Sequence, residues 1–255
     1  MKNFKISSIA ILLIAASSLT SCSKVIFKDT FNKDQLNMDN WSYEEGDGCP
    51  DLCGWGNAER QIYSRDFVEL EDGKLVITAV KDGDKYYSGK INTKDKVEFK
   101  YGNIEIRAKV ATGQGIWPAL WMLGADISEV GWPASGEIDL MEYVGKEPHT
   151  LYTSLHTPAS HGETINSKKT TLRDIEEGYH IYRTEWTEDH ISFSVDGNLV
   201  YTFTPENYDE NEYPFRKPFY FLINLAVGGN FGGPEVDDAI FPAKFYVDYI
   251  KVTKL

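Results

Sequence analysis

The chain has 255 residues and a formal net charge of −13 at pH 7. Its length suits one all-β domain as well as two smaller domains, so length alone does not fix the number of domains. The negative charge disfavours nucleic acid and anionic polysaccharides as partners, because like charges repel at long range, whereas a neutral polymer is indifferent to it.

The N-terminus is predicted to be an export signal. Lys2 and Lys5 precede an apolar stretch, residues 9–16, that is too short to span a bilayer. The tetrad Leu19-Thr20-Ser21-Cys22 resembles a bacterial lipobox, in which the cysteine thiol is acylated and the peptide bond before it is cut. We expect residues 1–21 to be a lipoprotein signal peptide and Cys22 to carry the lipid, with plain secretion as the alternative.

A chain processed in this way would be exported and held by its lipid at a bacterial outer membrane, on the surface or on the periplasmic face. Removal of 21 of the 255 residues would leave residues 22–255, a span of 234 residues, which we expect to form one catalytic domain. The loss of two lysines and no acid would change the net charge from −13 to −15. No later segment is long and apolar enough to cross a membrane, so the lipid would be the membrane contact.

Cys49 and Cys53 are the cysteines that remain. In an oxidising compartment they could form a disulfide across Pro50-Asp51-Leu52, but the ring is tight and its geometry could forbid the bond. Without a histidine cluster nearby, two thiols make a weak metal site. The sequence leaves a disulfide and two free thiols open.

Period-two alternation of apolar and polar residues recurs along the rest of the chain, and amphipathic helical spacing hardly appears. Thr187-Glu188-Asp189 separates two such runs and Asp196-Gly197 begins a turn, which indicates hairpins. The predicted strands are residues 74–80, 104–110, 181–186, 191–195, 199–203, 219–227 and 245–252.

Many short strands, without a Pro/Ser-rich linker or an internal repeat, predict an all-β fold built as one antiparallel β-sandwich. Two stacked sheets that curve leave one concave outer face, which is a natural groove for an extended polymer. We expect that face to carry polar and aromatic side chains.

Residues 136–144 contain three acids in a short run. A regular strand places Glu137 and Asp139 on one face and leaves Glu142 with the wrong parity. One extra residue near Leu140-Met141 would form a β-bulge and return Glu142 to the acidic face. The sequence therefore predicts a bulged strand with three carboxyl groups on one face.

Three carboxylates on one strand face repel one another, which raises the pKa of at least one, as a general acid near neutrality requires. Retaining glycosidases need two carboxyl groups about 5–5.5 Å apart, whereas a straight strand separates residues four positions apart by roughly 13 Å. The strand must therefore bend for this chemistry. A solvent-facing acidic strand and a calcium site are the alternatives.

The Glu-Ile-Asp-x-x-Glu pattern at Glu137, Asp139 and Glu142 resembles the catalytic signature of glycoside hydrolase family 16, and the resemblance extends over nearly the whole mature chain. It implies a jelly-roll, concanavalin-like sandwich with a concave substrate cleft. It also implies that Glu137 attacks the anomeric carbon, Glu142 protonates the leaving oxygen and later deprotonates water, and Asp139 holds and tunes the nucleophile.

Four further motifs resemble the laminarinase branch of the family more closely than the lichenases. Agarases and carrageenases share the bulge, so the bulge itself does not fix the substrate. The motifs are Trp55–Gln61, Gly115–Trp121, Gly131–Pro133 and Asn224–Asn230.

The residue types and the resemblance together predict eight substrate-binding side chains. Indole rings can stack on sugar faces, but large aromatics are often core, and at least one of Trp117 and Trp121 is as readily expected inward. Asn57 could belong to a turn, and Glu105 and Arg107 to a surface ion pair. The eight are Asn57, Glu59, Glu105, Arg107, Trp117, Trp121, Trp132 and Asn224.

His156 lies where the family places an aromatic residue or a histidine, on the strand next to the catalytic one. The resemblance implies a supporting catalytic role: aimed at Glu142, the imidazole could hold the proton of that carboxyl group. A structural histidine is the alternative. Phe231 stands where many laminarinases carry tryptophan, which leaves one stacking contact open.

Asp248 lies between apolar strand positions, where a carboxylate needs a partner. The resemblance implies a structural calcium ion bound by Asp248 and backbone carbonyls, one of them near Gly73, and a buried hydrogen bond is the simpler alternative. Catalysis itself is expected to need no cofactor.

The expected activity is that of a retaining endo-β-glucanase on laminarin-type β-1,3-glucan, with mixed-linkage β-1,3/1,4-glucan as a second substrate. The rivals are a mixed-linkage-specific glucanase and a non-catalytic glycan-binding surface lipoprotein on the same fold. We expect a monomer whose partner is a β-glucan polysaccharide or oligosaccharide.

Overall fold

The computed structural model describes residues 23–255, so the predicted signal peptide and Cys22 lie outside the described residues. Its helices are α1 (Ile127–Val130), α2 (Gly229–Gly232) and three 3-10 segments at Cys53–Gly56, Arg65–Phe67 and Asp238–Ile240. None of the helices in this range is long and apolar enough to span a membrane.

One layer of the fold is a ten-stranded sheet. Its strands are β1 (Val25–Asp29), β3 (Gln61–Tyr63), β4 (Val68–Glu71), β5 (Lys74–Asp82), β6 (Lys85–Ser88), β9 (Gly102–Lys109), β14 (His180–Trp186), β15 (Ile191–Val195), β16 (Asn198–Phe203) and β18 (Ala243–Thr253). The hydrogen-bonded order is β16-β15-β14-β9-β18-β5-β6-β3, with β1 beside β18 and β4 beside β5. The expected antiparallel pairing holds throughout this sheet except between β3 and β6, which are parallel.

The other layer is an eight-stranded antiparallel sheet. Its strands are β2 (Ser42–Tyr43), β7 (Lys90–Asn92), β8 (Glu98–Phe99), β10 (Ile116–Gly124), β11 (Glu137–Tyr143), β12 (Thr150–His156), β13 (Ser167–Thr171) and β17 (Phe219–Val227). The order is β13-β12-β11-β10-β17-β7-β2, with β8 beside β17. All seven predicted strands are present, each within two residues of its expected ends.

The core lies between the two sheets and follows from alternation along their strands. Ile106 and Phe245 of the ten-stranded sheet belong to the same core cluster as Leu120 and Ile223 of the eight-stranded sheet, and none of the four has exposed surface. Because each strand buries one face in this way, its intervening residues point outward. The expected β-sandwich is confirmed.

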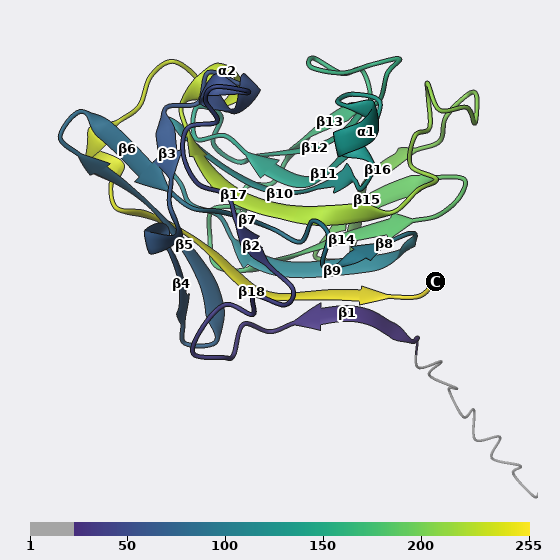
Figure 1. Ribbon diagram of the computed structural model, residues 1–255, viewed down its shortest axis with the longest axis horizontal. Helices are drawn as coiled ribbons and strands as arrows, with labels where there is room; N and C mark the ends of the chain where they lie inside the picture. Colours follow the sequence, from purple (N-terminus) through teal and green to yellow (C-terminus); the bar gives the residue numbers. More distant parts are fainter. Residues whose placement is uncertain (1–22) are drawn as a thin grey trace, which may run out of the picture.

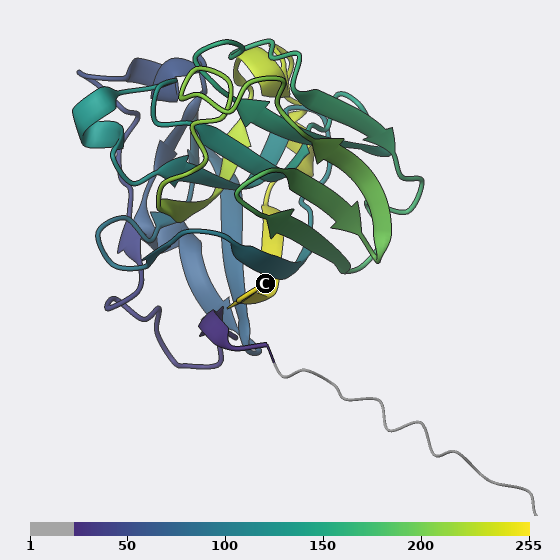
Figure 2. The same ribbon diagram turned by 90° about the vertical axis from the view of Figure 1, so that its right-hand side faces the viewer.

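The eight-stranded sheet is curved, and α1 and α2 stand at opposite ends of its outer face (Figure 1). Figure 2, turned by 90°, shows the C-terminus beside the start of β1, where Val25 pairs with Thr253 in the ten-stranded sheet. We call the outer face of the eight-stranded sheet the concave face. It carries Lys90, Asn92, Trp117, Trp121, Glu137, Asp139, Glu142, Tyr152, His156 and Asn224, which alternate with core residues.

Candidate active site

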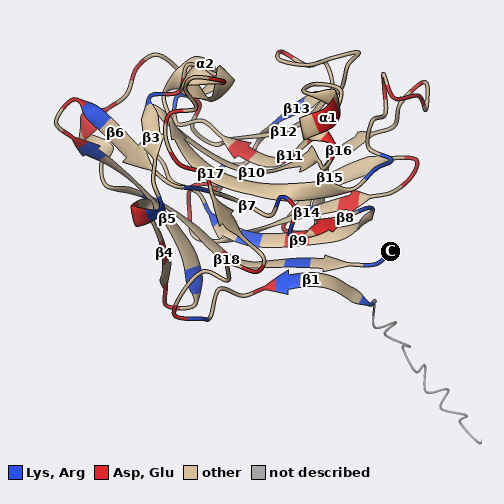
Figure 3. Ribbon diagram, viewed as in Figure 1, with Lys and Arg blue, Asp and Glu red and all other residues tan. Residues whose placement is uncertain are grey.

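Strand β11 contains the predicted bulge. Along β10, the partners of Met141 and Asp139 are consecutive residues, which leaves Leu140 between them without a partner. The pairing with β12 also shifts, between Asp139 and Glu142. The extra residue corrects the parity of Glu142, so the three acids share the concave face while Leu140 and Met141 join the core. Figure 3 shows acidic positions and no basic one in this strand.

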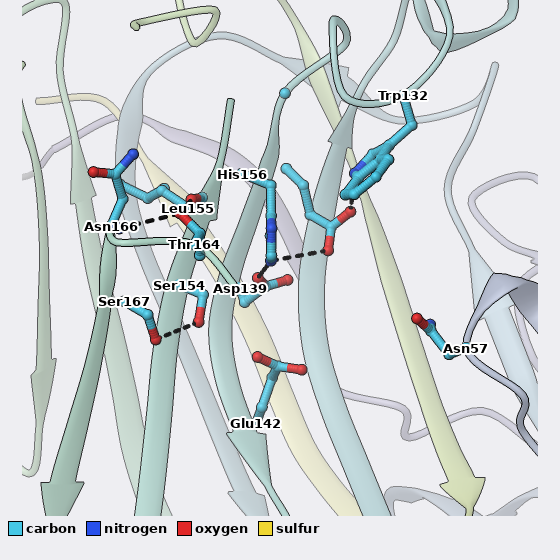
Figure 4. A network of polar contacts seen from close by, with 12 residues as sticks. Asn57, Trp132, Asp139, Glu142, Ser154, Leu155, His156, Thr164, Asn166 and Ser167 are labelled. Carbon is cyan, nitrogen blue, oxygen red and sulfur yellow. Dashed lines mark hydrogen bonds and ion pairs between the residues drawn. The ribbon is translucent and has the colours of Figure 1, made fainter. Parts of the chain in front are cut away.

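Each of the two outer acids accepts a hydrogen bond from an indole. The Nε1–H of Trp132 donates to Glu137 Oε2 at 2.9 Å, and the Nε1–H of Trp117 donates to Glu142 Oε1 at 3.1 Å. Asp139 is 3% exposed and Glu142 8% exposed, so both are largely shielded from water. Figure 4 shows Asp139 and Glu142 together with Trp132 and His156 around one space.

From the sequence we expected His156 to face Glu142, but it does not. Its Nε2 lies 3.2 Å from Asp139 Oδ2 and 3.8 Å from Glu137 Oε1. The cause is the register of β11 and β12, which places His156 directly opposite Glu137. The imidazole is therefore in position to hold the nucleophile side of the site, and the expected direct contact with the acid/base is wrong.

Burial raises the pKa of all three carboxyl groups above their ordinary values. For Glu137, burial is the largest cause of the raised pKa and the charge of Asp139 is the second. The charge of His156 and the Trp132 hydrogen bond lower this pKa in part. For Glu142, burial is again the largest cause, followed by the charge of Asp139. The pKa of Asp139 rises through burial, which a hydrogen bond with Glu137 offsets in part. The site therefore holds protons near neutral pH.

Glu142→Gln is expected to raise the free energy of unfolding near neutral pH. The folded-state pKa of Glu142 lies above its unfolded value, so stability is full below about pH 4.3 and falls as the pH rises toward the folded-state pKa. Glutamine removes this loss, so the free energy of unfolding should rise by roughly 1–2 kcal/mol and Tm by about 2–8 °C. Thermal melts at pH 8 and pH 4 test it, and the gain should be absent at pH 4.

Glu105→Gln is the matched control for that experiment. Partial burial raises the pKa of Glu105, but hydrogen bonds from Tyr249 and Arg183 outweigh it and the net shift is downward. The carboxylate therefore stabilises the fold above its unfolded pKa, and that stability is lost as the pH falls through the folded-state value. Glu105→Gln should lower Tm at pH 8. The same direction of change in both variants would contradict the argument.

Both Trp117 and Trp121 lie on the concave face, so the alternative that one of them points into the main core is wrong. They are four residues apart on β10 and alternate with Ile116, Leu120 and Met122, which are core residues. Trp132 precedes β11 and has 46% of its surface exposed, more than any other tryptophan in the described chain. It is therefore the indole most available for stacking on a sugar ring.

A chain of hydrogen bonds joins four of the predicted binding residues. Trp121 Nε1–H donates to Asn224 Oδ1 at 2.7 Å, and Asn224 Nδ2–H donates to the Tyr63 hydroxyl at 3.0 Å. That hydroxyl donates to Glu59 Oε2 at 3.1 Å, and Asn57 Nδ2–H donates to Glu59 Oε1 at 3.3 Å. Asn57, Glu59, Trp121 and Asn224 therefore form one connected polar surface.

Three residues of this surface were missed in the sequence. Gln61 Nε2–H donates to Glu59 at 2.6 Å, and the Tyr63 hydroxyl bridges Glu59 and Asn224. Lys90, 6% exposed, pairs with Glu44 at 2.9 Å and its ammonium lies 4.1 Å from the centre of the Trp55 ring. Gln61 ends the Trp55–Gln61 motif, and this position was the available signal for it, whereas Tyr63 and Lys90 gave none.

Cys49 and Cys53 form a disulfide, which decides between the two alternatives that the sequence left open. The bond closes a loop that leads directly into the 3-10 segment Cys53–Gly56. Trp55 in that segment has a φ of 53°, a left-handed conformation that a residue other than glycine adopts at a cost. The disulfide therefore restrains the segment that presents Trp55 and Asn57.

The double variant Cys49→Ser/Cys53→Ser is expected to raise KM for a glucan by roughly two- to tenfold and to leave kcat within about twofold, because it loosens binding groups and not the acids. Steady-state kinetics on an oligosaccharide series measures both constants. Wild-type protein treated with a reductant should match the double variant, and the reductant should not change the variant itself. An unchanged KM would show that the disulfide does not position this loop.

Glu105 and Arg107 do not reach the concave face, which corrects the expectation from the sequence. Strand β9 lies between β14 and β18 in the ten-stranded sheet, and these two side chains point away from the core on the far side of the sandwich. Glu105 pairs with Arg183 at 2.7 Å. The alternative of surface ion pairs is the correct one.

The far face around Glu105 has a hollow of about 360 Å³. Apart from Ile104 it is lined by polar and charged side chains, none of them aromatic, and it therefore lacks a flat ring on which a sugar could stack. Its lining residues are Asn103, Ile104, Glu105, Arg183, Thr184, Glu185, Ser192, Ser194, Lys251 and Thr253.

Asp248 forms an ion pair with Arg107. Its carboxylate is therefore paired with a guanidinium. Among residues 23–255, Asp248 does not belong to a group of three or more acidic, histidine or cysteine side chains that could hold a metal ion. Calcium prefers six to eight oxygen ligands that include carboxylates. The simpler alternative is present as a hydrogen bond from the Arg107 guanidinium to Asp248, although this side chain is 28% exposed, and the calcium ion stays a prediction.

The model for Glycosyl hydrolases family 16 matches residues 56–251. The crystal structure of a laminarinase from Flavobacterium sp. UMI-01 has a TM-score of 0.89 and 57% identity, over 91% of this chain and 100% of that one. Glucan endo-1,3-beta-glucosidase A1 of Niallia circulans is 40% identical over 90% of this chain, which spans 38% of that protein. Beta-glucanase of Rhodothermus marinus is 36% identical over 90% of this chain and 84% of its own length. The chain therefore belongs to glycoside hydrolase family 16.

Proposed function

We propose that this glycoside hydrolase is a retaining endo-β-1,3-glucanase that cleaves laminarin-type glucan, with mixed-linkage β-1,3/1,4-glucan as a second substrate. The observation that carries the proposal is the bulge in β11, which gives Glu137, Asp139 and Glu142 one face of a curved sheet. Paired carboxyl groups beside stacking aromatics suit hydrolysis of a neutral polysaccharide.

In the first step Glu142 acts as the acid and Glu137 as the nucleophile. Burial raises the pKa of Glu142, so the group holds a proton near neutral pH and can give it to the glycosidic oxygen. As the bond to that oxygen breaks, the Glu137 carboxylate attacks the anomeric carbon and forms a covalent glycosyl-enzyme.

The roles of Glu137 and Asp139 follow from their different surroundings. Glu137 accepts the Trp132 indole N–H and its side chain is 18% exposed, whereas the Asp139 side chain is 4% exposed and its buried Oδ2 has no hydrogen-bond donor. Because the two carboxyl groups interact, they titrate as a pair, and attack on the anomeric carbon requires the form in which Glu137 is ionised. The contact of His156 with both groups favours the charged nucleophile.

In the second step Glu142 reverses its role. Having lost its proton, it takes one from water, and the resulting hydroxide attacks the anomeric carbon from the side that the first product left. The bond to Glu137 breaks and the carboxylate is regenerated. Two inversions at one carbon give net retention of configuration.

Digestion of two glucans tests the substrate assignment. Purified protein should release reducing sugar from laminarin and, at a lower rate, from cereal mixed-linkage glucan, and a ladder of oligosaccharides early in the reaction would mark endo cleavage. Activity on cereal glucan alone would favour the mixed-linkage-specific rival. Binding of laminarin without release of reducing sugar would favour the glycan-binding lipoprotein.

The endo-β-1,3 assignment is supported by the names of the relatives from Niallia circulans and Flavobacterium sp. UMI-01. The connected surface of Asn57, Glu59, Trp121 and Asn224 supports an extended neutral ligand, because it offers hydrogen-bonding groups without a net basic character. In the described part of the chain, Lys and Arg are dispersed among Asp and Glu (Figure 3).

We also propose that the protein is an exported, lipid-anchored monomer, with the lipid on Cys22 after removal of residues 1–21. The proposal is supported by the Leu19-Thr20-Ser21-Cys22 tetrad and by the disulfide, which suits an oxidising compartment. Strand β1 begins at Val25 in the ten-stranded sheet, so an anchor at Cys22 would leave the concave face open to a polymer. Metabolic labelling with a palmitate analogue, with Cys22→Ala as the control, tests the anchor.

A further inference from the structure

Three side chains at the nucleophile form a set of potential metal ligands. One ligand atom from each of Glu137, Asp139 and His156 lies within 4.8 Å of the others. His156 Nε2 is 3.2 Å from Asp139 Oδ2 and 3.8 Å from Glu137 Oε1. Bonds of about 2.0–2.1 Å to a tetrahedral zinc ion place its ligand atoms roughly 3.4 Å apart, so the two separations from His156 are close to those of such a site, and the two carboxylates lie within 4.8 Å of each other.

Asp139, the central carboxylate of this set, lacks a hydrogen-bond donor at one of its oxygens. Asp139 is 3% exposed, and its buried Oδ2 has no hydrogen-bond donor although it faces His156. Among residues 23–255, no lysine or arginine pairs with Glu137 or Asp139, and His156 is the one basic side chain in contact with them. A buried and a partly buried carboxylate without a full counter-charge attract a dication more strongly than an exposed acidic pair does.

The kind of ligand atoms selects the kind of metal. One imidazole nitrogen and two carboxylate oxygens suit zinc and cobalt, whereas calcium and magnesium prefer sites made of oxygen alone. Three protein ligands leave a fourth position for water. An ion bound to Glu137 Oε1 draws negative charge from the carboxylate and lies beside it, which weakens and covers the nucleophile.

We propose that Glu137, Asp139 and His156 form a binding site for a divalent transition-metal cation, of which zinc is the best fit, and that the bound ion inhibits the enzyme by occupying the nucleophile. The inhibition rests on the proposed function, but the binding does not.

Binding is measured first, without any substrate. Titration of the protein with cobalt(II) should produce the intense visible absorption of a tetrahedral complex, and zinc should displace the cobalt. His156→Gln should weaken zinc binding by at least about tenfold, since loss even of a group supporting a ligand costs that much. Asp139→Asn provides a second test should His156→Gln fold poorly, as judged from its circular dichroism and Tm.

His161→Gln is the matched control. The His161 ring lies 5.2 Å from the Trp132 ring, but its Nδ1 contacts the Thr157 carbonyl and it forms no contact with the acids. This variant should bind zinc like the wild-type protein. Equal affinity in the wild type, His156→Gln and Asp139→Asn would overturn the proposed site, as would weaker binding in His161→Gln alone.

Inhibition is then measured on laminarin. Zinc should raise the apparent KM, a chelator should restore it, and the inhibition constant should match the affinity measured without substrate. Zinc binding in a protein that hydrolyses no glucan would refute the proposed function and leave the metal site in place. Hydrolysis that zinc does not inhibit, in a protein that binds no cobalt, would refute the metal site alone.

Discussion

Glu137→Gln is expected to hydrolyse laminarin at least about 10³-fold more slowly than the wild-type protein, which corresponds to about 4 kcal/mol of lost transition-state stabilisation. Glutamine keeps the size of the side chain and an oxygen that can accept the Trp132 N–H, whose donor now lies 2.9 Å from the carboxylate. The amide has no charge with which to attack an anomeric carbon. The loss should therefore appear in kcat, with KM changed much less.

The control for this experiment is Glu105→Gln, which removes the same charge on the far side of the sandwich. It should hydrolyse laminarin within about twofold of the wild-type rate, as surface substitutions usually do. Both variants should give the circular dichroism spectrum of the wild type. Near-normal turnover by Glu137→Gln would contradict the assigned nucleophile, and a large loss in Glu105→Gln would contradict the placement of β9.

The acidic strand could be predicted from the sequence because parity is a local rule. Residues 136–144 already showed that Glu142 needed one extra residue to join Glu137 and Asp139, and the structure places that residue at Leu140. The long alternating strands were predicted for the same reason. In each case a short window contained all the information, since the side-chain period of a strand is two.

The placement of a strand in one layer or the other is not local. Alternation in β9 shows that Glu105 and Arg107 oppose the buried residues, but it does not show which sheet contains the strand. Both sheets bury their inner faces in one core, so an outward residue can lie on either side of the sandwich. The pairing of β9 with β14 and β18 puts these two on the far side.

The remaining misses have a related cause. His156 was expected to face Glu142, but the register between β11 and β12 decides its neighbour, and register depends on the bulge and on the loop that joins the strands. Tyr63 and Lys90 lie in strands of three residues each, which are too short to show a period. Their roles depend on partners far along the chain, such as Asn224, 161 positions from Tyr63.

Glu142→Ala is expected to slow laminarin hydrolysis by about 10²- to 10⁴-fold, the usual contribution of a general acid/base. With dinitrophenyl β-laminaribioside as the substrate, formation of the glycosyl-enzyme should be slowed much less. The dinitrophenolate leaving group departs as an anion and needs no proton. The variant also removes the acceptor of the Trp117 N–H, which now lies 3.1 Å away. An unmet buried donor costs about 1–3 kcal/mol, so assays must stay well below the lowered Tm.

Azide separates the roles of the two glutamates. In Glu142→Ala, azide can enter the space of the lost side chain and attack the glycosyl-enzyme without a base, so the rate should recover and the product should be a β-glycosyl azide. In Glu137→Ala, azide would attack the substrate directly on the face of the missing nucleophile, and the product should be an α-glycosyl azide. The anomeric proton coupling in the NMR spectrum distinguishes the two products. An α-azide from Glu142→Ala would exchange the assignments, because only the residue that forms the covalent bond determines which face a substitute anion attacks.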